Sequence, residues 1–195
     1  LHSEYSLLDG ACRIKELVLR VKELGQKAVA VTDHGNMFAA VEFYNECLAQ
    51  GIKPIIGCEV YVAPRTRFDK LAKIDSSPYH LVLLCENNEG YQNLIKLVSA
   101  AYTEGFYSKP RVDVELLEKY HNGLICLSAC LAGEIPRKLT NGDYEAAKQT
   151  ALKYRDIFGR DNYFIELQNH KFADQQRILP MLIKLSRETG IPMVC

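Results

Sequence analysis

Short apolar runs alternate with longer stretches of helical periodicity along this chain. Apolar positions that recur every three or four residues predict helices over residues 11–24, 37–50, 88–104, 113–120, 143–158 and 173–189. The mainly apolar runs between them predict strands over residues 28–32, 54–62, 80–85, 123–128, 163–168 and 191–195. Strands that are apolar on both faces and separated by amphipathic helices are typical of a parallel sheet, so the pattern indicates one α/β domain over residues 1–195.

The absence of a Gly-x-Gly-x-x-Gly turn after any predicted strand favours a β/α barrel over a dinucleotide-binding sheet. Residues 63–78 fit neither a helix nor a strand and carry Arg65, Arg67, Lys70 and Lys73. Two interpretations of this segment stay open, a flexible active-site loop and a solvated surface loop.

Composition limits the classes of function. The chain has 24 basic and 24 acidic residues, so its formal net charge is +0, whereas a protein that grips a long duplex through its phosphates usually carries a basic excess. Its seven cysteines form no Cys-x-x-Cys pair and several lie within apolar runs, which indicates reduced thiols and a cytoplasmic location. No apolar run reaches the ~18 residues of a membrane span. Both ends are expected to be cut from a longer chain, because the sequence starts without Met and stops within an apolar run.

Residue types that bind metals gather near the predicted strand ends, where a β/α barrel builds its site. The candidates are His2, Asp9, His34, Glu59, His80 and Cys130. Imidazole, carboxylate and thiolate groups are the ligands of zinc, iron and manganese. Taken singly, a histidine in an apolar strand is more often a packed core residue, and Cys130 more often a buried thiol. Their coincidence in successive units predicts a metal site.

Three of the candidate positions carry particular arguments. Glu59 is flanked by apolar residues and would be costly to bury unpaired, so it requires a cation or a hydrogen-bond donor. Asp33, next to His34, is either a helix cap or a group that orients a ligand imidazole. His80 begins its apolar run, whereas the barrel argument favours the ends of strands.

At these residues the chain resembles a known family. The segments His-Ser-Glu-Tyr-Ser-Leu-Leu-Asp-Gly (2–10), Thr-Asp-His-Gly (32–35), Ile-Lys-Pro-Ile-Ile-Gly-Cys-Glu-Val-Tyr-Val (52–62) and Tyr-His-Leu-Val-Leu-Leu (79–84) resemble the polymerase-and-histidinol-phosphatase (PHP) domain. The form they resemble stands at the N-terminus of bacterial replicative DNA polymerase III alpha subunits. Segments 88–94, 123–134 and 163–170 continue the similarity, which covers essentially the whole chain.

The resemblance implies a distorted seven-stranded, TIM-like β/α barrel that holds up to three divalent metal ions (Zn, Mn or Fe, with Mg also possible) through nine ligands. Six of the nine ligand positions fall on His2, Asp9, His34, Glu59, His80 and Cys130, with Glu59 as the bridging carboxylate. The first histidine of the family's His-x-His pair would lie one residue before Leu1, and its closing Asp-x-His would follow Cys195. The resemblance therefore also implies that His80 is a ligand.

The implied activity is metal-dependent phosphodiester hydrolysis, as a 3′–5′ exonuclease that proofreads a DNA 3′ end beside a DNA-directed DNA polymerase. The implied partners are that DNA end, the other domains of the polymerase and a separate proofreading subunit, with no membrane. A non-catalytic, metal-stapled scaffold and a phosphatase of small esters are the alternatives. No paired-Asp polymerase motif is present in the chain. His170 either donates to a phosphate or caps the loop after its strand.

Overall fold

The computed structural model describes the whole chain, residues 1–195. Its strands are β1 (Ala28–Val31), β2 (Lys53–Val62), β3 (Tyr79–Cys85), β4 (Arg111–Val112), β5 (Leu124–Leu127), β6 (Tyr163–Glu166) and β7 (Met193–Val194). Its helices are α1 (Ile14–Glu23), α2 (Ala40–Gln50), α3 (Ala72–Asp75), α4 (Asn88–Thr103), α5 (Val114–Tyr120), α6 (Glu134–Thr140), α7 (Tyr144–Phe158) and α8 (Ala173–Thr189). None of these helices is both long enough and apolar enough to cross a membrane.

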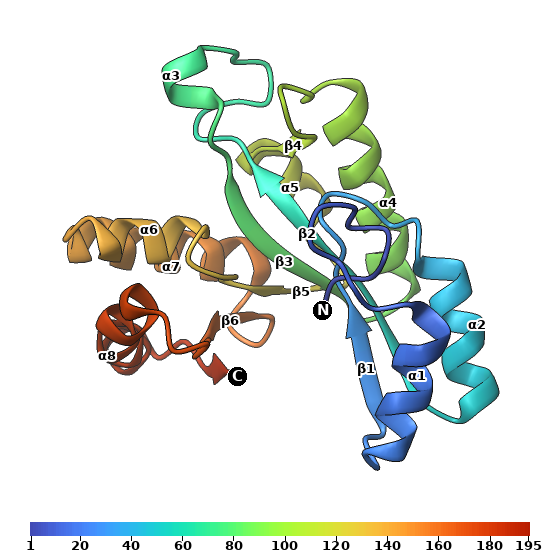
Figure 1. Cartoon of the computed structure of the whole chain (residues 1–195). Helices are drawn as coiled ribbons and strands as arrows, with labels where there is room; N and C mark the ends of the chain where they lie inside the picture. Colours follow the sequence, from blue (N-terminus) through green and yellow to red (C-terminus); the bar gives the residue numbers. More distant parts are fainter.

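The seven strands form one curled sheet that makes a half-barrel, as the sequence predicted in outline (Figure 1). The strand order is β1-β2-β3-β5-β6-β7, and the two-residue strand β4 pairs with the end of β2 on the edge opposite β3. The predicted helices and strands are present with boundaries shifted by a few residues. The elements β4, α3 and α6 were not predicted; β4 has two residues and α3 has four, which is too few to show a period.

The prediction of a parallel sheet was wrong for β3. This strand is antiparallel to both of its neighbours, with Tyr61 opposite His80 on β2 and Val82 opposite Leu127 on β5. The other pairings are parallel. Two neighbouring parallel strands need a long crossover, usually a helix, that carries the chain back to the end of the sheet where the first strand began. The connection from β2 to β3 contains only the four-residue helix α3, so β3 runs back in the opposite direction.

Alternating side chains give the sheet two distinct faces. One face packs under α4, α5, α7 and α8 and supplies the main core, 26 buried residues that include Val60, Leu83, Cys126 and Ile165. A second, smaller core joins α1 and α2 to β1. The opposite face of the strands, called the inner face here, carries the residues between these core positions, among them Glu59 on β2 and His80 on β3. The polar residues of the strands are therefore gathered on one side.

The segment of residues 63–78 projects from one end of the sheet and contains α3 (Figure 1). Its backbone is held by Arg111 of β4, which is completely buried and donates to the carbonyl oxygens of Arg67, Asp69, Asp75 and Gly105. The side chain of Arg67 reaches Asp113 and Glu104, and Arg65 makes a two-bond contact with Asp75. These contacts favour an ordered surface segment over a flexible loop.

Candidate metal centre

Four of the predicted ligands meet at one rim of the inner face because of the strand directions. His34 follows β1, Glu59 lies within β2 and Cys130 follows β5. His80 opens β3, and because β3 runs antiparallel, its first residues lie at the same rim as the last residues of its neighbours. This reversal accounts for a histidine at the start of a strand, which the sequence argument could not place.

The segment that carries His2 is tied to the end of β1. The N–H of Thr32 donates to the carbonyl of Leu1 at 2.9 Å, and the N-terminal amino group of Leu1 donates to the Thr32 hydroxyl at 2.8 Å. His2 Nδ1 lies 2.8 Å from the Thr32 carbonyl oxygen, so it is the donor nitrogen, which leaves Nε2 free to act as a ligand. The ring of His2 stacks on that of His34, with 3.9 Å between the ring centroids.

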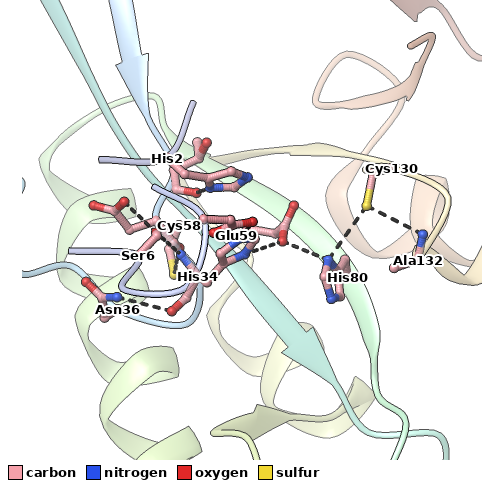
Figure 2. Close-up of polar contacts among 12 residues, drawn as sticks. His2, Ser6, His34, Asn36, Cys58, Glu59, His80, Cys130 and Ala132 are labelled. Carbon is pink, nitrogen blue, oxygen red and sulfur yellow. Dashed lines mark hydrogen bonds and ion pairs between the residues drawn. The ribbon is translucent and has the colours of Figure 1, made fainter. Parts of the chain in front are cut away.

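Two triads of potential ligand atoms result, and they share Glu59 (Figure 2). One consists of His2, His34 and Glu59, and the other of Glu59, His80 and Cys130. Within each triad the ligand atoms lie within 4.8 Å of one another. Because Glu59 belongs to both triads and its carboxylate has two oxygens, it is suited to be a bridging ligand.

Glu59 is held as a carboxylate by the two imidazoles beside it. Its side chain is only 6% exposed, and Oε1 lies 2.7 Å from Nδ1 of both His34 and His80. Burial alone would raise the pKa of Glu59, but the hydrogen bonds from His34 and His80 outweigh it and lower the pKa to about 2. The donor that the sequence demanded for this buried carboxylate is therefore present.

The three histidines differ in how easily they give up a proton. Burial works against a charged His80, but its contacts with Cys130 and Glu59 raise the pKa to about 9. The hydrogen bond to Glu59 raises the pKa of His34, whereas burial and then the neighbouring charge of His34 lower the pKa of His2. Raised pKa values on His34 and His80 beside a shared carboxylate show that the cluster attracts positive charge, which suits the binding of cations.

Cys130 and Asp9 stand at the two ends of the cluster. The sulfur of Cys130 lies 3.7 Å from His80 Nδ1 and accepts from the N–H of Ala132 at 3.4 Å. Asp9 belongs to neither triad, although its carboxylate lies 3.0 Å from His34 Nε2. Its side chain is 58% exposed, so the structure places Asp9 beside His34 on the solvent side of the cluster.

Asp33 does not orient an imidazole, contrary to one of the two predicted roles. Its carboxylate is almost fully buried and accepts from the N–H of Ser3 at 2.6 Å and from the hydroxyls of Ser3 and Ser6 at 2.7 Å each. The Ser6 hydroxyl oxygen in turn accepts from the N–H of His34 at 3.1 Å. Asp33 therefore anchors the segment that leads to Asp9, and it acts on the cluster through that segment. It is not a cap of α2 either, because that helix begins with no side-chain cap.

His170 lies outside the cluster. The residue is exposed, and its ring lies next to that of Phe172, with 6.4 Å between the ring centroids. The loop after β6 is capped through the main chain, since the N–H of His170 donates to Gln175 Oε1 at 2.7 Å.

Glu166, at the end of β6, is the polar residue that the sequence argument missed. A carboxylate inside a predicted, partly apolar strand, residues 163–168, was the available signal.

The donor atoms fit divalent metals. Two imidazoles with a carboxylate, and an imidazole with a carboxylate and a thiol, are ligand sets of zinc, iron and manganese, and the carboxylate suits magnesium as well. Three protein ligands in each triad leave room for water or substrate at an ion, as catalytic sites require. The cluster is therefore suited to hold divalent ions through His2, His34, Glu59, His80 and Cys130.

Comparison with solved structures concerns the fold. Two solved structures share the fold at low sequence identity. An amidohydrolase from Chromobacterium violaceum has a TM-score of 0.58 and 14% identity, and the match covers 98% of this chain and 83% of that one. A putative metal-dependent phosphoesterase from Bifidobacterium adolescentis has a TM-score of 0.54 and 11% identity, and the match covers 95% of this chain and 81% of that one. Both likenesses concern the fold alone. They place the curled sheet among folds that include metal-dependent hydrolases.

Sequence relatives and a family model are more specific. DNA polymerase III subunit alpha of Treponema pallidum is 53% identical over 195 residues, which is 100% of this chain and 17% of the relative. DNA polymerase III subunit alpha of Thermus aquaticus is 46% identical over 197 residues, which covers 99% of this chain and 16% of the relative. The chain thus spans about a sixth of the length of these relatives. The PHP domain model matches residues 1–170. The chain therefore belongs to the PHP domain family, in the form that DNA polymerase III alpha subunits carry.

Proposed function

We propose that this domain hydrolyses phosphodiester bonds with divalent metal ions and removes nucleotides from a DNA 3′ end, as a 3′–5′ exonuclease. The observation that carries the proposal is the sharing of Glu59 between the two ligand triads. A pair of ions a few ångströms apart is the arrangement that many nucleases and phosphatases use for displacement at phosphorus. The solved structure described as a putative metal-dependent phosphoesterase shares the fold, and a reaction of that class is compatible with the fold.

The side chains have separable tasks in this reaction. When bound, the ions would lower the pKa of a water molecule and stabilise negative charge that develops on the phosphate. Glu59 would hold two ions together, with His2 and His34 on one side and His80 and Cys130 on the other. Asp33 keeps the His2–Asp9 segment against the cluster through Ser3 and Ser6.

The neutral net charge fits a domain that contacts only a strand end. The ions would supply local positive charge for the phosphates, and other parts of a longer polymerase would hold the duplex. We infer that the domain works in DNA replication in the bacterial cytoplasm, alongside the polymerase activity of that longer chain. The nucleotidyl transfer itself belongs to the other polymerase domains.

The test is the substitution Glu59→Gln in the complete protein. Degradation of a DNA 3′ end should fall by about 100-fold or more, because the amide cannot bridge two cations, while primer extension stays measurable. Glu134→Gln is the matched control, since Glu134 is a half-buried glutamate whose partners are Lys138 and Tyr154. Trimming by the Glu59→Gln protein at the original rate would refute the nuclease assignment.

A second candidate function is that of a non-catalytic scaffold, in which the metal ions only stabilise the fold. The observation in its favour is the ordered segment 63–78, which exposes Phe68, Leu71 and Ile74 although Arg111 fixes its backbone. A fixed shape with exposed apolar side chains suits a contact with the remaining polymerase domains or with a proofreading subunit. In that case the Glu59→Gln protein would lose metal and partner binding together, and the wild-type protein would show no metal-dependent trimming.

A further inference from the structure

Glu166 is a second carboxylate on the inner face of the sheet. On β6, Tyr163 and Ile165 point into the core, so Phe164 and Glu166 face the same side as Glu59. Phe164 is paired with Leu127 of β5, which places Glu166 opposite Ala129, next to Cys130. The N–H of Glu166 donates to the Ser128 hydroxyl oxygen at 2.9 Å. The end of β6 and the turn that carries Cys130 are therefore directly joined.

One oxygen of Glu166 lacks the partner that burial requires. Oε1 accepts from Gln168 Nε2 at 2.6 Å, whereas Oε2 is shielded from solvent and has no hydrogen-bond partner. Burial raises the pKa of Glu166, although contacts with the Gln168 amide and the Ala129 N–H oppose this. A buried carboxylate oxygen without a partner costs free energy, and it commonly marks the place of a bound water or ion.

A small cavity lies beside Glu166. It measures about 10 Å³ and is lined by Cys130, Glu166, Gln168 and Gln175 together with apolar side chains. That volume is close to the minimum for one water molecule. No lysine or arginine lines the cavity, so no side chain there balances the charge of Glu166. An ion held by Cys130 and its triad partners would add positive charge on this side of Glu166.

The turn between β5 and Cys130 has an unusual backbone. Ala129 is 2% exposed and adopts a φ of 62°, in the left-handed region. For a residue with a Cβ this conformation is strained, so the surrounding contacts must hold it. The Ser128 hydroxyl, which accepts from the Glu166 N–H, and the neighbouring carboxylate of Glu166 are among the polar groups at this turn. The direction of the Cys130 side chain depends on this conformation.

We propose that Glu166 is a positioning residue of the metal centre, which supports the ion at Glu59, His80 and Cys130 through its negative charge and through the Ser128–Cys130 turn. The cavity that Glu166 lines has space for a single water, and this water would link the carboxylate to the ion's surroundings. The inference rests on the proposed metal-dependent function and adds a residue to it. Carboxylates that support ligands in this way typically change metal affinity by 10- to 100-fold.

The experiment uses the complete protein, stripped of metal and titrated with Co²⁺. A thiolate bound to Co²⁺ gives a charge-transfer absorption band in the near ultraviolet, which reports the Cys130 side of the cluster. In Glu166→Gln we expect the band to form with an affinity about 10- to 100-fold lower. Glu134→Gln should titrate like the wild type, and Cys130→Ser should abolish the band.

A second measurement separates positioning from plain structural support. The metal-free Glu166→Gln protein should resist urea at least as well as the wild type, because the substitution removes a buried, unpaired charge. Equal Co²⁺ affinity in Glu166→Gln and wild type would overturn the inference, and so would parallel losses of affinity and metal-free stability. If Glu166→Gln fails to fold, the Glu166→Asp variant is tested instead. Asp keeps the negative charge, so failure of this variant to fold as well would show that Glu166 has a structural role only.

Failure of the proposed function gives a different result. If the wild-type protein shows no thiolate band, the metal assignment of Cys130 fails, and the role of Glu166 fails with it. If the wild-type band is present and Glu166→Gln leaves it unchanged, only the inference about Glu166 is refuted.

Discussion

Replacing Asp33 by asparagine should separate the two halves of the metal cluster. Asp33 is 1% exposed, and its two oxygens accept three hydrogen bonds, two from Ser3 and one from Ser6. Asparagine keeps one oxygen acceptor and places an NH2 group where the other oxygen was. One of the three donors then meets another donor, and all three bonds lose the benefit of the negative charge.

The magnitude follows from these bonds. A hydrogen bond to a charged group contributes about 1.5–3 kcal/mol and a neutral one about 0.5–1.5 kcal/mol, so each of the three loses roughly 1 kcal/mol. We expect Asp33→Asn to lower the free energy of unfolding by about 3 kcal/mol. With a urea dependence of about 2 kcal/mol per M for a chain of this size, the midpoint should fall by roughly 1.5 M.

The assay is urea unfolding of the metal-free chain, followed by measurement of bound metal in the folded protein. Asp9→Asn is the control, because Asp9 lies on the same segment but is 58% exposed and contacts only His34, which limits its contribution to less than about 1 kcal/mol. Asp33→Asn should bind less metal, because the segment that carries His2 is released, while the triad of Glu59, His80 and Cys130 remains. A midpoint within 0.3 M of the wild type, or an equal loss in Asp9→Asn, would refute this account of Asp33.

Two further predictions concern stability. Arg111→Met should lower the free energy of unfolding by about 3–5 kcal/mol and open residues 63–78 to proteases, since four backbone carbonyls lose their buried donor; unchanged cleavage in that segment would contradict the role of Arg111. In the metal-free chain, the raised pKa of His80, about 9, contributes stability that is fully present below pH 6.5 and is lost as the pH rises through 9. Its loss should lower the free energy of unfolding by at most about 3 kcal/mol between pH 6.5 and 9.5, and a midpoint that stays constant over this range would show that His80 is not charged. The lowered pKa of Glu59, about 2, acts in the opposite direction, since its contribution is present above pH 4.5 and is lost as the pH falls through 2.

The sequence determined the elements and the types of chemical group. The apolar runs identified six of the seven strands. Gly51 and Gly190 end α2 and α8 with φ values of 72° and 69°, a conformation that glycine adopts without strain. The apolar neighbours of Glu59 required a partner for its carboxylate, and His34 and His80 supply it. These features depend on local periodicity and on the cost of burying a charge, and both can be evaluated from neighbouring residues.

Only the tertiary structure decided which of these groups meet. The direction of β3 depends on the path of residues 63–78, and the hydrophobic pattern of a strand is the same in either direction. For that reason the sequence could not bring His80 to the rim where His34, Glu59 and Cys130 lie. The anchoring of Ser3 and Ser6 by Asp33 likewise joins residues about 30 positions apart, through contacts that exist only after the chain has folded.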